Sequence, residues 1–377
     1  MASPVRRVLI YSIKAGAGHM RAAEAIATVL AETAPDTEVK NIEALTLTNS
    51  AFRRSFTATY NKLATDLPSI WGYIYGTMER KSVGSRVKRL TTLFDRANST
   101  GILETAQEFD PDAIVCTHYF PAEILAAHRR KGKLRATLHV TLTDYDIHTM
   151  WIQPGVDHYY VATDEMAFAL REKGVGDAEV HVTGIPLMPA FSQKYPPRAT
   201  LRRRLGLRED AVTVLASAGG FGLGGVDETV AGLASTSERI QILAIAGRNA
   251  ELEASLRAVA ANHPGRVVPF GFVTNMHELM AASDFAVTKP GGLTSSECMA
   301  LGVPMVIIQP IPGQEERNAD YLLENGVALR ANSDAHLTWK VRTLLEDDAR
   351  RAAMAAAARR TARPRAAYDV AAQILAG

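Results

Sequence analysis

Residues 289–319 read KPGGLTSSECMALGVPMVIIQPIPGQEERNA and contain two turns in which a short apolar strand gives way to a helix. The first strand, DFAVTK, ends at Lys289, and the second, PMVIIQ, ends at Gln309. This order predicts neighbouring parallel strands, because a parallel connection needs a long crossover that usually contains a helix. Ligands of such sheets bind beyond the carboxyl ends of the strands, which is where both turns lie.

The same alternation of strand and helix patterns runs through the chain and restarts once. It breaks at 186–200, PLMPAFSQKYPPRAT, where four prolines favour an extended linker. We therefore predict an α/β protein of two doubly wound parallel-sheet domains, 1–190 and 191–377, with a last helix that can pack back on the first domain. We expect strands at 5–12, 37–44, 112–118, 136–144, 158–163 and 180–186, and then at 212–220, 240–247, 266–272, 284–289 and 304–309.

The composition is that of an ordinary globular protein and argues against several classes of partner. A net charge of +2 over 377 residues is too small for a typical nucleic-acid-binding protein. Cys116 and Cys298 are too few and too far apart for a disulfide framework, which is typical of the reducing cytoplasm. No apolar run approaches the ~20 residues of a membrane helix, and residues 1–9 are too charged for a signal sequence. We expect a cytoplasmic protein whose contact with any membrane is peripheral.

Residues 52–89 carry a concentration of positive charge. They contain eight Lys or Arg against Asp66 and Glu79, so the rest of the chain has a net charge of −4. Six aromatic residues, from Phe52 to Tyr75, are interleaved with these charges. Such a mixture suits an anionic membrane surface, where basic groups meet phosphates and aromatic rings lie among the headgroups. It also suits a helical insertion whose aromatic residues pack on their own domain.

A glycine-rich turn follows the first strand, in YSIKAGAGHMRAAEAI at 11–26. Gly16 and Gly18 precede a helix that we expect to begin near His19, and the amides at such a helix start attract negative or electron-rich groups. At this position His19 is either a local hydrogen-bonding residue or a base that orients or deprotonates a substrate hydroxyl. A helix N-terminus lowers the pKa of a histidine and keeps it neutral, as a base must be.

The same turn also suggests a different class of enzyme. Gly16, Gly18 and Ala22 approximate a dinucleotide-binding fingerprint, and Glu43 ends the second strand where a ribose-binding acid would lie. An NAD-dependent oxidoreductase is therefore an alternative, although the two bulky residues after Gly18 occupy space that a pyrophosphate needs.

Two segments of the second domain are candidates for an anion site. SAGGFGLGG, at 217–225, has five glycines after a strand, and the amides of such a loop can line an anion site. KPGG, at 289–292, has two glycines that let the backbone approach a ligand and a proline that fixes the turn. The helix that we expect to begin at Thr294 would point its amides at a diphosphate, with Lys289 as the counter-charge.

Glu297 has two interpretations. Thr294 and Glu297 have the spacing of a capping box, in which Glu297 caps the helix. Alternatively, the Glu297 carboxylate accepts hydrogen bonds from the vicinal hydroxyls of a ribose. The second turn brings Gln314 and Glu315 to another helix start at the same edge of the sheet, so one helix start can bind phosphates and the other sugar hydroxyls.

Together these motifs resemble a known family. KPGGLTSSE followed by PIPGQEERNADYLLENG is similar to the donor site of the glycolipid-forming glycosyltransferases of family 28, which include monogalactosyldiacylglycerol synthases and bacterial diacylglycerol glucosyltransferases. The resemblance continues in GAGHMRAAEAI, in LTDYDIHTMWIQPGVDHYYVATDEM and in VTGIPLMPAF, so it spans almost the full chain. The sequence is more distantly similar to the transferase that adds N-acetylglucosamine to the lipid-linked peptidoglycan precursor.

The resemblance implies a GT-B fold, in which two Rossmann-like domains face a cleft and the C-terminal domain binds a UDP-sugar without a metal or other cofactor. The glycines and the KPGG turn would flank the diphosphate, Phe272 and Val273 the uracil, Glu297 the ribose, and Gln314 and Glu315 the sugar. The donor-binding residues would be Gly219, Gly220, Phe272, Val273, Lys289, Pro290, Gly291, Gly292, Leu293, Thr294, Glu297, Gln314 and Glu315. The candidate catalytic groups are His19 and Asp144, with Gly18, His148 and Trp151 on the acceptor side.

The implied activity is that of an inverting glycosyltransferase that moves galactose or glucose from a UDP-sugar to diacylglycerol or a glycosyl-diacylglycerol. Residues 52–89 would dock on an anionic membrane surface, at the inner face of the plasma membrane. The alternatives are the NAD-dependent oxidoreductase, an N-acetylglucosamine transferase acting on a lipid-linked acceptor, and a non-catalytic UDP-sugar sensor. The choice between galactose and glucose stays open, because Gln314 and Glu315 can form hydrogen bonds with either.

Overall fold

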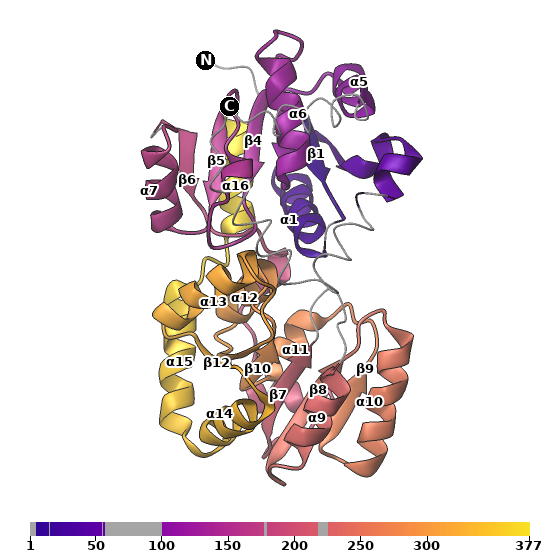
Figure 1. Ribbon diagram of the computed structural model, residues 1–377, viewed down its shortest axis with the longest axis vertical. Helices are drawn as coiled ribbons and strands as arrows, with labels where there is room; N and C mark the ends of the chain where they lie inside the picture. Colours follow the sequence, from indigo (N-terminus) through magenta and orange to yellow (C-terminus); the bar gives the residue numbers. More distant parts are fainter. Residues whose placement is uncertain (1–4, 15, 55, 57–99, 177–178, 218–224) are drawn as a thin grey trace. The chain divides into compact units, whose positions relative to one another are not determined.

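The computed structural model describes residues 5–14, 16–54, 56, 100–176, 179–217 and 225–377. The chain divides into two compact units, shown in Figure 1, and each is described by itself. The first unit comprises Met1–Pro189, Ile311–Gln314 and Arg363–Gly377, and the second comprises Ala190–Pro310 and Glu315–Ala362. Most of the segment 52–89, in which we predicted a membrane-binding surface, lies outside the described residues.

The first unit contains a sheet whose six described strands are all parallel, in the order β2-β1-β3-β4-β5-β6. The strands are β1 (Arg7–Ser12), β2 (Glu38–Glu43), β3 (Ala113–Cys116), β4 (Thr137–Thr141), β5 (His158–Val161) and β6 (Val180–Val182). The helices are α1 (Gly18–Thr33), α5 (Thr100–Phe109), α6 (Tyr119–Arg129), α7 (Asp164–Glu172) and α16 (Ala366–Ala376), with 3₁₀ turns η1 (Ala44–Leu47) and η2 (Thr149–Trp151). All six predicted strands of this half are confirmed.

The last helix of the chain packs on the first sheet. The apolar residues of α16 recur at the spacing of one helical face and lie in the same core as those of α1. Alanines dominate the contact between these two helices, which lets their backbones approach closely. In Figure 1 both helices lie against the same face of the sheet. The core on this face consists of Val8, Ile10, Ala23, Ala25, Ile26, Val29, Leu30, Ala113, Val115, Tyr160, Ala367, Val370, Ala371 and Ile374.

The second unit contains another parallel sheet, in the order β12-β11-β10-β7-β8-β9. Its strands are β7 (Val212–Ser217), β8 (Ile240–Ile245), β9 (Val267–Phe270), β10 (Phe285–Thr288), β11 (Met305–Ile308) and β12 (Ala328–Ala331). Its helices are α8 (Arg198–Arg204), α9 (Val226–Ala234), α10 (Ala250–Asn262), α11 (Met276–Ala282), α12 (Gly292–Ala300), α13 (Gln314–Glu324), α14 (Asp334–Glu346) and α15 (Asp348–Thr361), and the 3₁₀ turn η4 (Pro189–Ser192) precedes them.

The helices of the second unit are divided between the two faces of its sheet. α9, α10 and α14 cover one face and share a continuous core with alternate residues of the six strands. α12 packs on α15, and α11 packs on α8 and β7. The five strands predicted for this half are confirmed, whereas β12 was missed because its sequence, ALRA, is short and has no clear alternation. The linker expected at 186–200 is less extended than predicted, since η4 and α8 begin within it.

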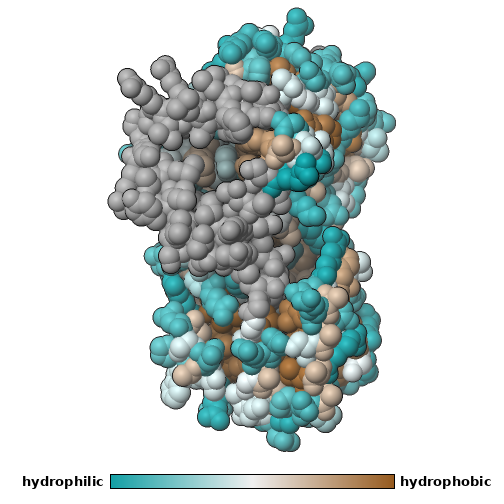
Figure 2. All heavy atoms as spheres, turned by 45° about the vertical axis from the view of Figure 1, so that its right-hand side comes forward, coloured by the Kyte–Doolittle hydropathy of each residue, from teal (hydrophilic) through white to brown (hydrophobic). Residues whose placement is uncertain are grey.

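The described surface gives no sign of a membrane span. Among the residues placed by the structure, no helix is long and apolar enough to cross a bilayer. In the view of Figure 2 the coloured surface is mainly hydrophilic, with smaller hydrophobic patches. Of the described part of 52–89, Phe52 and Phe56 pack on Phe120 of α6, with ring centroids 5.6 and 5.7 Å apart. For these two rings the packing agrees with the alternative interpretation, a helical insertion whose aromatic residues pack on their own domain.

Three histidines lie side by side on one face of the first sheet. His139 and His158 are paired in register on β4 and β5, with ring centroids 4.7 Å apart. His158 Nδ1 lies 3.1 Å from His181 Nε2 on β6, and the Tyr160 hydroxyl lies 2.8 Å from His139 Nδ1. Burial lowers the pKa of His139 to about 3, and the charges of His158, His181 and Arg129 act in the same direction. Burial is also the main reason that the pKa values of His158 and His181 are lowered.

The lowered pKa values of these three histidines predict that the first unit loses stability in acid. The unfolded chain binds protons near the ordinary histidine pKa of about 6.5, whereas the folded chain binds them only at lower pH. The stabilisation is therefore complete above pH 6.5 and is lost as the pH falls from there toward about 3. For His139→Gln we expect the pH slope of the free energy of unfolding in urea to be smaller by up to about 1.4 kcal/mol per pH unit.

The control for this experiment is His336→Gln, which changes an exposed histidine of α14. It should keep the slope of the unmodified protein. Equal slopes for the His139 variant and the unmodified protein between pH 6.5 and 4 would contradict the prediction.

Candidate functional site

Each sheet reverses its strand order at one point, and the predicted site residues follow the strands that meet there. In the first sheet β2 and β3 lie on opposite sides of β1, so the reversal lies between β1 and β3. In the second sheet β8 and β10 lie on opposite sides of β7, so the reversal lies between β7 and β10. His19 follows β1 and Lys289 follows β10, at the carboxyl edges where open α/β sheets bind their ligands.

His19 is held in one orientation by two residues of neighbouring strand ends. Its Nδ1 lies 2.7 Å from the carbonyl oxygen of Thr117 and 3.0 Å from Oγ1 of Thr143. In return the Thr117 hydroxyl donates to the carbonyl oxygen of His19 at 3.0 Å. A carbonyl oxygen can only accept, so Nδ1 carries the proton and Nε2 of the neutral ring keeps its lone pair. The side chain is partly exposed, which leaves it accessible to a substrate.

The electrostatic surroundings keep His19 neutral. Burial lowers its pKa, whereas the negative charge of Asp144 and the hydrogen bond to Thr117 raise it, and the net effect is a decrease. The direction agrees with the prediction, but the largest cause is burial rather than the start of α1. A neutral ring whose Nε2 has a lone pair is the form that can remove a proton from a hydroxyl.

Two aromatic rings lie close to the ring of His19. The ring of His118 meets it edge-on with centroids 4.8 Å apart, and the Trp151 ring lies 6.1 Å away. His118 caps α6, since its Nδ1 accepts from the amide of Phe120. The sequence analysis missed Thr117, His118 and Thr143, although THYF directly follows an apolar strand and TLTD another. Polar residues at the ends of two predicted parallel strands are the signal that would have identified them.

The remaining predicted acceptor-side residues have local structural roles. Gly18 is the first residue of α1, and His148 caps η2, which carries Trp151. Glu43, the acid of the dinucleotide interpretation, instead accepts hydrogen bonds from the amides of Lys14 and Leu45 at the end of β2. This carboxylate therefore orders its own turn.

Lys289 lies beside the start of the glycine-rich loop of the second unit. Thr288 pairs in register with Ser217, so Lys289 follows β10 at the level where SAGGFGLGG follows β7. Gly219 and Gly220 lie outside the described residues. The Oγ1 of Thr288 and the Oγ of Ser295 are buried and have no hydrogen-bond partner within the described part of the chain. Buried hydroxyls are normally satisfied, so both are candidates for contact with a ligand.

The start of α12 differs from the prediction in a way that separates the two interpretations of Glu297. The helix begins at Gly292, its N-cap is Gly291, and no side chain of the cap residue accepts a hydrogen bond. Thr294 is therefore the third helical residue, and the capping box with Glu297 is wrong. Glu297 lies inside the helix and is buried. With a glycine as the cap, the first amides of α12, including those of Gly292 and Leu293, are available to an anion.

The second predicted helix start lies next to the first. α13 begins at Gln314, as predicted, and Glu315 is buried like Lys289, each being 8% exposed. Burial lowers the pKa of Lys289, whereas the charge of Glu315 raises it. A Cβ at Gly291 would lie 3.9 Å from Oε1 of Glu315, so this carboxylate faces the KPGG turn. Pro290 completes that turn before α12.

The other candidate donor residues follow β9. Phe272 is exposed and Val273 partly exposed, just beyond the end of β9. The guanidinium of Arg248, which follows β8, lies 4.5 Å from the centroid of the Phe272 ring. This cation–π contact holds the aromatic ring at the carboxyl edge of the sheet. The sequence analysis missed Arg248 because it depends on the pairing of β8 with β9.

A cavity of about 450 Å³ lies at the carboxyl ends of β11 and β12. Gln309, in its lining, has a φ of 41°, a left-handed conformation that costs a residue with a Cβ about 1 to 2 kcal/mol. Arg330, also in the lining, lies 3.8 Å from Glu316, and its Nε has no hydrogen-bond partner among the described residues. Backbone strain and a buried donor without a partner at one edge are features of functional sites. No cluster of three or more metal-ligating side chains occurs in the described ranges.

The chain matches two models of known protein families. Residues 19–187 match the monogalactosyldiacylglycerol (MGDG) synthase family, and residues 200–361 match the glycosyl transferases of group 1. The processive diacylglycerol β-glucosyltransferase of Bacillus pumilus is 35% identical over 263 residues, which cover 69% of this chain and 67% of that protein. The enzyme of the same name from Bacillus subtilis is 32% identical over 263 residues, covering 69% and 68%.

Solved structures agree with these two units in fold. MurG of Acinetobacter baumannii has a TM-score of 0.65 at 17% identity and covers 99% of this chain and 100% of its own. The UDP-GlcNAc 2-epimerase of Neisseria meningitidis bound to UDP-GlcNAc has a TM-score of 0.62 at 11% identity, with the same coverage. These likenesses confirm the predicted GT-B fold. By the identity and coverage of its relatives, the chain belongs to the glycosyltransferase family that contains the monogalactosyldiacylglycerol synthases and the processive diacylglycerol β-glucosyltransferases.

Proposed function

We propose that this protein transfers a hexose from UDP-glucose or UDP-galactose to diacylglycerol, with inversion at the anomeric carbon. The proposal rests on one observation in each unit: the second unit has an uncapped helix start with buried Lys289 and Glu315 beside it, and the first unit has a neutral His19 with a fixed tautomer. The named relatives supply the substrate class, since they are called diacylglycerol glucosyltransferases. HepE of Anabaena, which has a related fold, was solved in complex with UDP-glucose.

In the proposed reaction the acceptor hydroxyl attacks the anomeric carbon from the face opposite UDP. Nε2 of His19 takes the hydroxyl proton, a bond forms between the hydroxyl oxygen and the anomeric carbon, and the bond from that carbon to the β-phosphate oxygen breaks. The amides at the start of α12 and the ammonium of Lys289 stabilise the negative charge that develops on the departing UDP. A single displacement of this kind converts the α-linkage of the donor into a β-glycoside.

The other candidate residues bind the two substrates in this proposal. Gly219 and Gly220 flank the diphosphate with the KPGG turn, Phe272 and Val273 border the uracil, and Gln314 and Glu315 contact the hexose. Asp144 acts on His19 through its charge. We propose no metal, because Lys289 and the α12 amides supply the positive potential. We also propose that the basic segment 52–89 brings the enzyme to an anionic membrane, on the cytoplasmic face.

A donor and acceptor assay tests the proposal directly. The purified chain is given labelled UDP-glucose, UDP-galactose or UDP-N-acetylglucosamine with diacylglycerol in anionic vesicles, with a metal chelator present. We expect labelled glycolipid from one of the two hexose donors. A parallel reaction contains an undecaprenyl-linked acceptor instead of diacylglycerol, and label found only there would support the N-acetylglucosamine transferase. UDP binding without any transfer would support a sensor.

The role of His19 is tested by its variant. His19→Ala should lower kcat by about 10²- to 10⁴-fold, the usual contribution of a general base, and leave the affinity for UDP unchanged. The exposed residue His336 of α14 supplies the matched control, and His336→Ala should retain full activity. If both variants kept the activity of the unmodified protein, the assignment of the base would be wrong.

The pH profile reports the charge of Asp144. Because burial lowers the pKa of His19, the acid limb of kcat/KM should lie below pH 6.5. Asp144 raises the pKa of His19, so Asp144→Asn should move this limb to still lower pH, and histidine NMR titration should show the same direction. The charge of Asp146, two residues away, is not among the causes of the His19 pKa shift, so Asp146→Asn should leave the limb in place. A shift to higher pH in Asp144→Asn would contradict the assignment.

The role of Glu297 is tested with two nucleotides. If its carboxylate binds the ribose, Glu297→Gln should weaken UDP binding by about 10- to 100-fold, the effect of losing hydrogen bonds to a charged group. The same variant should lose much less affinity for 2′-deoxy-UDP, which lacks one of the two hydroxyls. Glu324→Gln, at the exposed end of α13, is the control. Equal losses for both nucleotides would indicate a structural role only.

A further inference from the structure

Four arginines gather at the amino edge of the second sheet, the edge opposite the donor-binding residues. Asp284 directly precedes β10 at this edge, and Gly302 lies between α12 and β11. Positive charges of Arg359, Arg202 and Arg351 all act on Arg198, so the other three guanidiniums lie within electrostatic reach of Arg198. Arg198 and Arg202 belong to α8, and Arg351 and Arg359 belong to α15.

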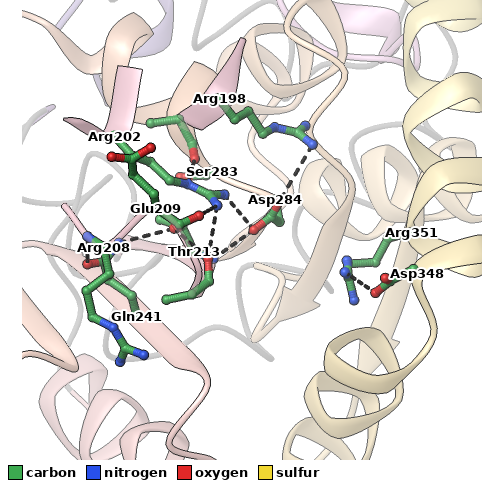
Figure 3. Close-up of polar contacts among 12 residues, drawn as sticks. Arg198, Arg202, Arg208, Glu209, Thr213, Gln241, Ser283, Asp284, Asp348 and Arg351 are labelled. Atoms are coloured by element: carbon green, nitrogen blue, oxygen red, sulfur yellow. Dashed lines mark hydrogen bonds and ion pairs between the residues drawn. The ribbon is translucent and has the colours of Figure 1, made fainter. Parts of the chain in front are cut away.

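The carboxylate of Asp284 is mostly engaged by one of these arginines. Arg202 Nη2 lies 2.6 Å from Asp284 Oδ2, which also accepts from the amide of Thr213 at 2.8 Å. Arg198 reaches only the other oxygen, Oδ1, at 3.5 Å. Figure 3 shows Arg198 and Arg202 both directed toward Asp284, while Arg351 pairs with Asp348 of its own helix. Arg202 and Arg351 are therefore well compensated, and Arg198 is not.

Arg198 and Arg359 meet at the same glycine. Arg198 Nη2 lies 3.4 Å from the carbonyl oxygen of Gly302. The guanidinium of Arg359 lies next to the Cα of Gly302, because a Cβ at Gly302 would be 2.5 Å from Arg359 Nε. Among the described residues no carboxylate pairs with Arg359, which is exposed on α15. Two guanidiniums thus approach Gly302, and the carboxylate that Arg198 reaches, that of Asp284, is already engaged by Arg202.

The surrounding negative charge does not balance this cluster. The C-termini of α12 and α15 each supply about half a negative charge, and together with Asp284 and Asp348 they leave about one positive charge uncompensated. Burial lowers the pKa of Arg198, Asp284 raises it, and the three other arginines lower it again, for a net decrease. An arginine whose charge is disfavoured by its surroundings gains stability when an anion binds beside it.

We propose that Arg198 and Arg359 form a binding site for a phosphate-bearing anion at the amino edge of the second unit. The planar guanidinium matches the oxygens of a phosphate and can donate two parallel hydrogen bonds to it. The site is separate from the proposed donor site, which lies at the carboxyl ends of the same strands. The ligand is either a free phosphate group or the headgroup of an anionic phospholipid. The proposal is independent of the transferase activity.

The test uses the full chain saturated with UDP, so that added phosphate cannot bind at the proposed donor site and contribute to the signal. Titration calorimetry and thermal unfolding are measured with inorganic phosphate for the unmodified protein, Arg359→Gln and Arg360→Gln. Arg360 is the neighbouring exposed arginine of α15 and controls for net charge. We expect Arg359→Gln to weaken phosphate binding by at least about tenfold and Arg360→Gln to change it by less than about twofold. Without phosphate the Tm of Arg359→Gln should not decrease, since a repulsion is removed.

Vesicle flotation distinguishes the two sources of the anion. Neutral phosphatidylcholine vesicles are compared with vesicles that also contain an anionic phospholipid, using the same three proteins. If calorimetry detects binding of inorganic phosphate and Arg359→Gln weakens it, the site binds free phosphate. If Arg359→Gln weakens only the flotation with anionic vesicles, the site binds a lipid headgroup. Equal effects of Arg359→Gln and Arg360→Gln would mean unspecific attraction and would overturn the proposal. Absence of binding to both probes would overturn it as well.

Discussion

The reversal of strand order in a parallel sheet is the constraint on which the candidate site residues of each unit depend. Two strands that lie side by side at the reversal send their helices to opposite faces, so the turns that follow them diverge and leave the helix starts uncovered. In the first sheet α1 leaves β1 on the face that it shares with α16, and β3 continues into α6. In the second sheet α9 leaves β7 on the face of α14, whereas α12 packs on α15. His19 and Lys289 are placed by this geometry.

The electrostatics around Lys289 in the second unit and His19 in the first follow from burial. A lysine that is 8% exposed next to an equally buried glutamate has lost most of its hydration, and its charge is supported mainly by that carboxylate. The diphosphate that we propose to bind here would restore a counter-charge where water is scarce, so its interaction with Lys289 would be stronger than at an open surface. His19 uses burial in the opposite sense, because desolvation keeps the ring neutral and ready to accept a proton.

Sequence reasoning could place those candidate residues whose position depends on local pattern. Lys289, Gln314 and Glu315 follow predicted strands, so their edge of the sheet was predictable from periodicity alone. The start of α12 was misplaced by two residues, because a glycine cap has no side-chain signature, whereas Thr294 and Glu297 have a misleading one. Thr117, Thr143 and Arg248 were missed for another reason. Their roles depend on which strands are neighbours, and strand order is set by packing over distances that a local pattern does not record.

Glycines in this chain serve two different purposes, and only the structure separates them. Gly291 and Gly292 form an uncapped helix start, where the absence of a side chain leaves the amides open. Gly184 and Gly302 instead have positive φ, and a Cβ at either would collide with an arginine of the returning chain, Arg363 at 2.6 Å in the first unit and Arg359 at 2.5 Å in the second. In each unit, therefore, an arginine near the end of the chain packs against a glycine. A glycine within a family motif such as VTGIPLMPAF is therefore no evidence of ligand contact by itself, because close packing of backbone on side chain demands the same residue.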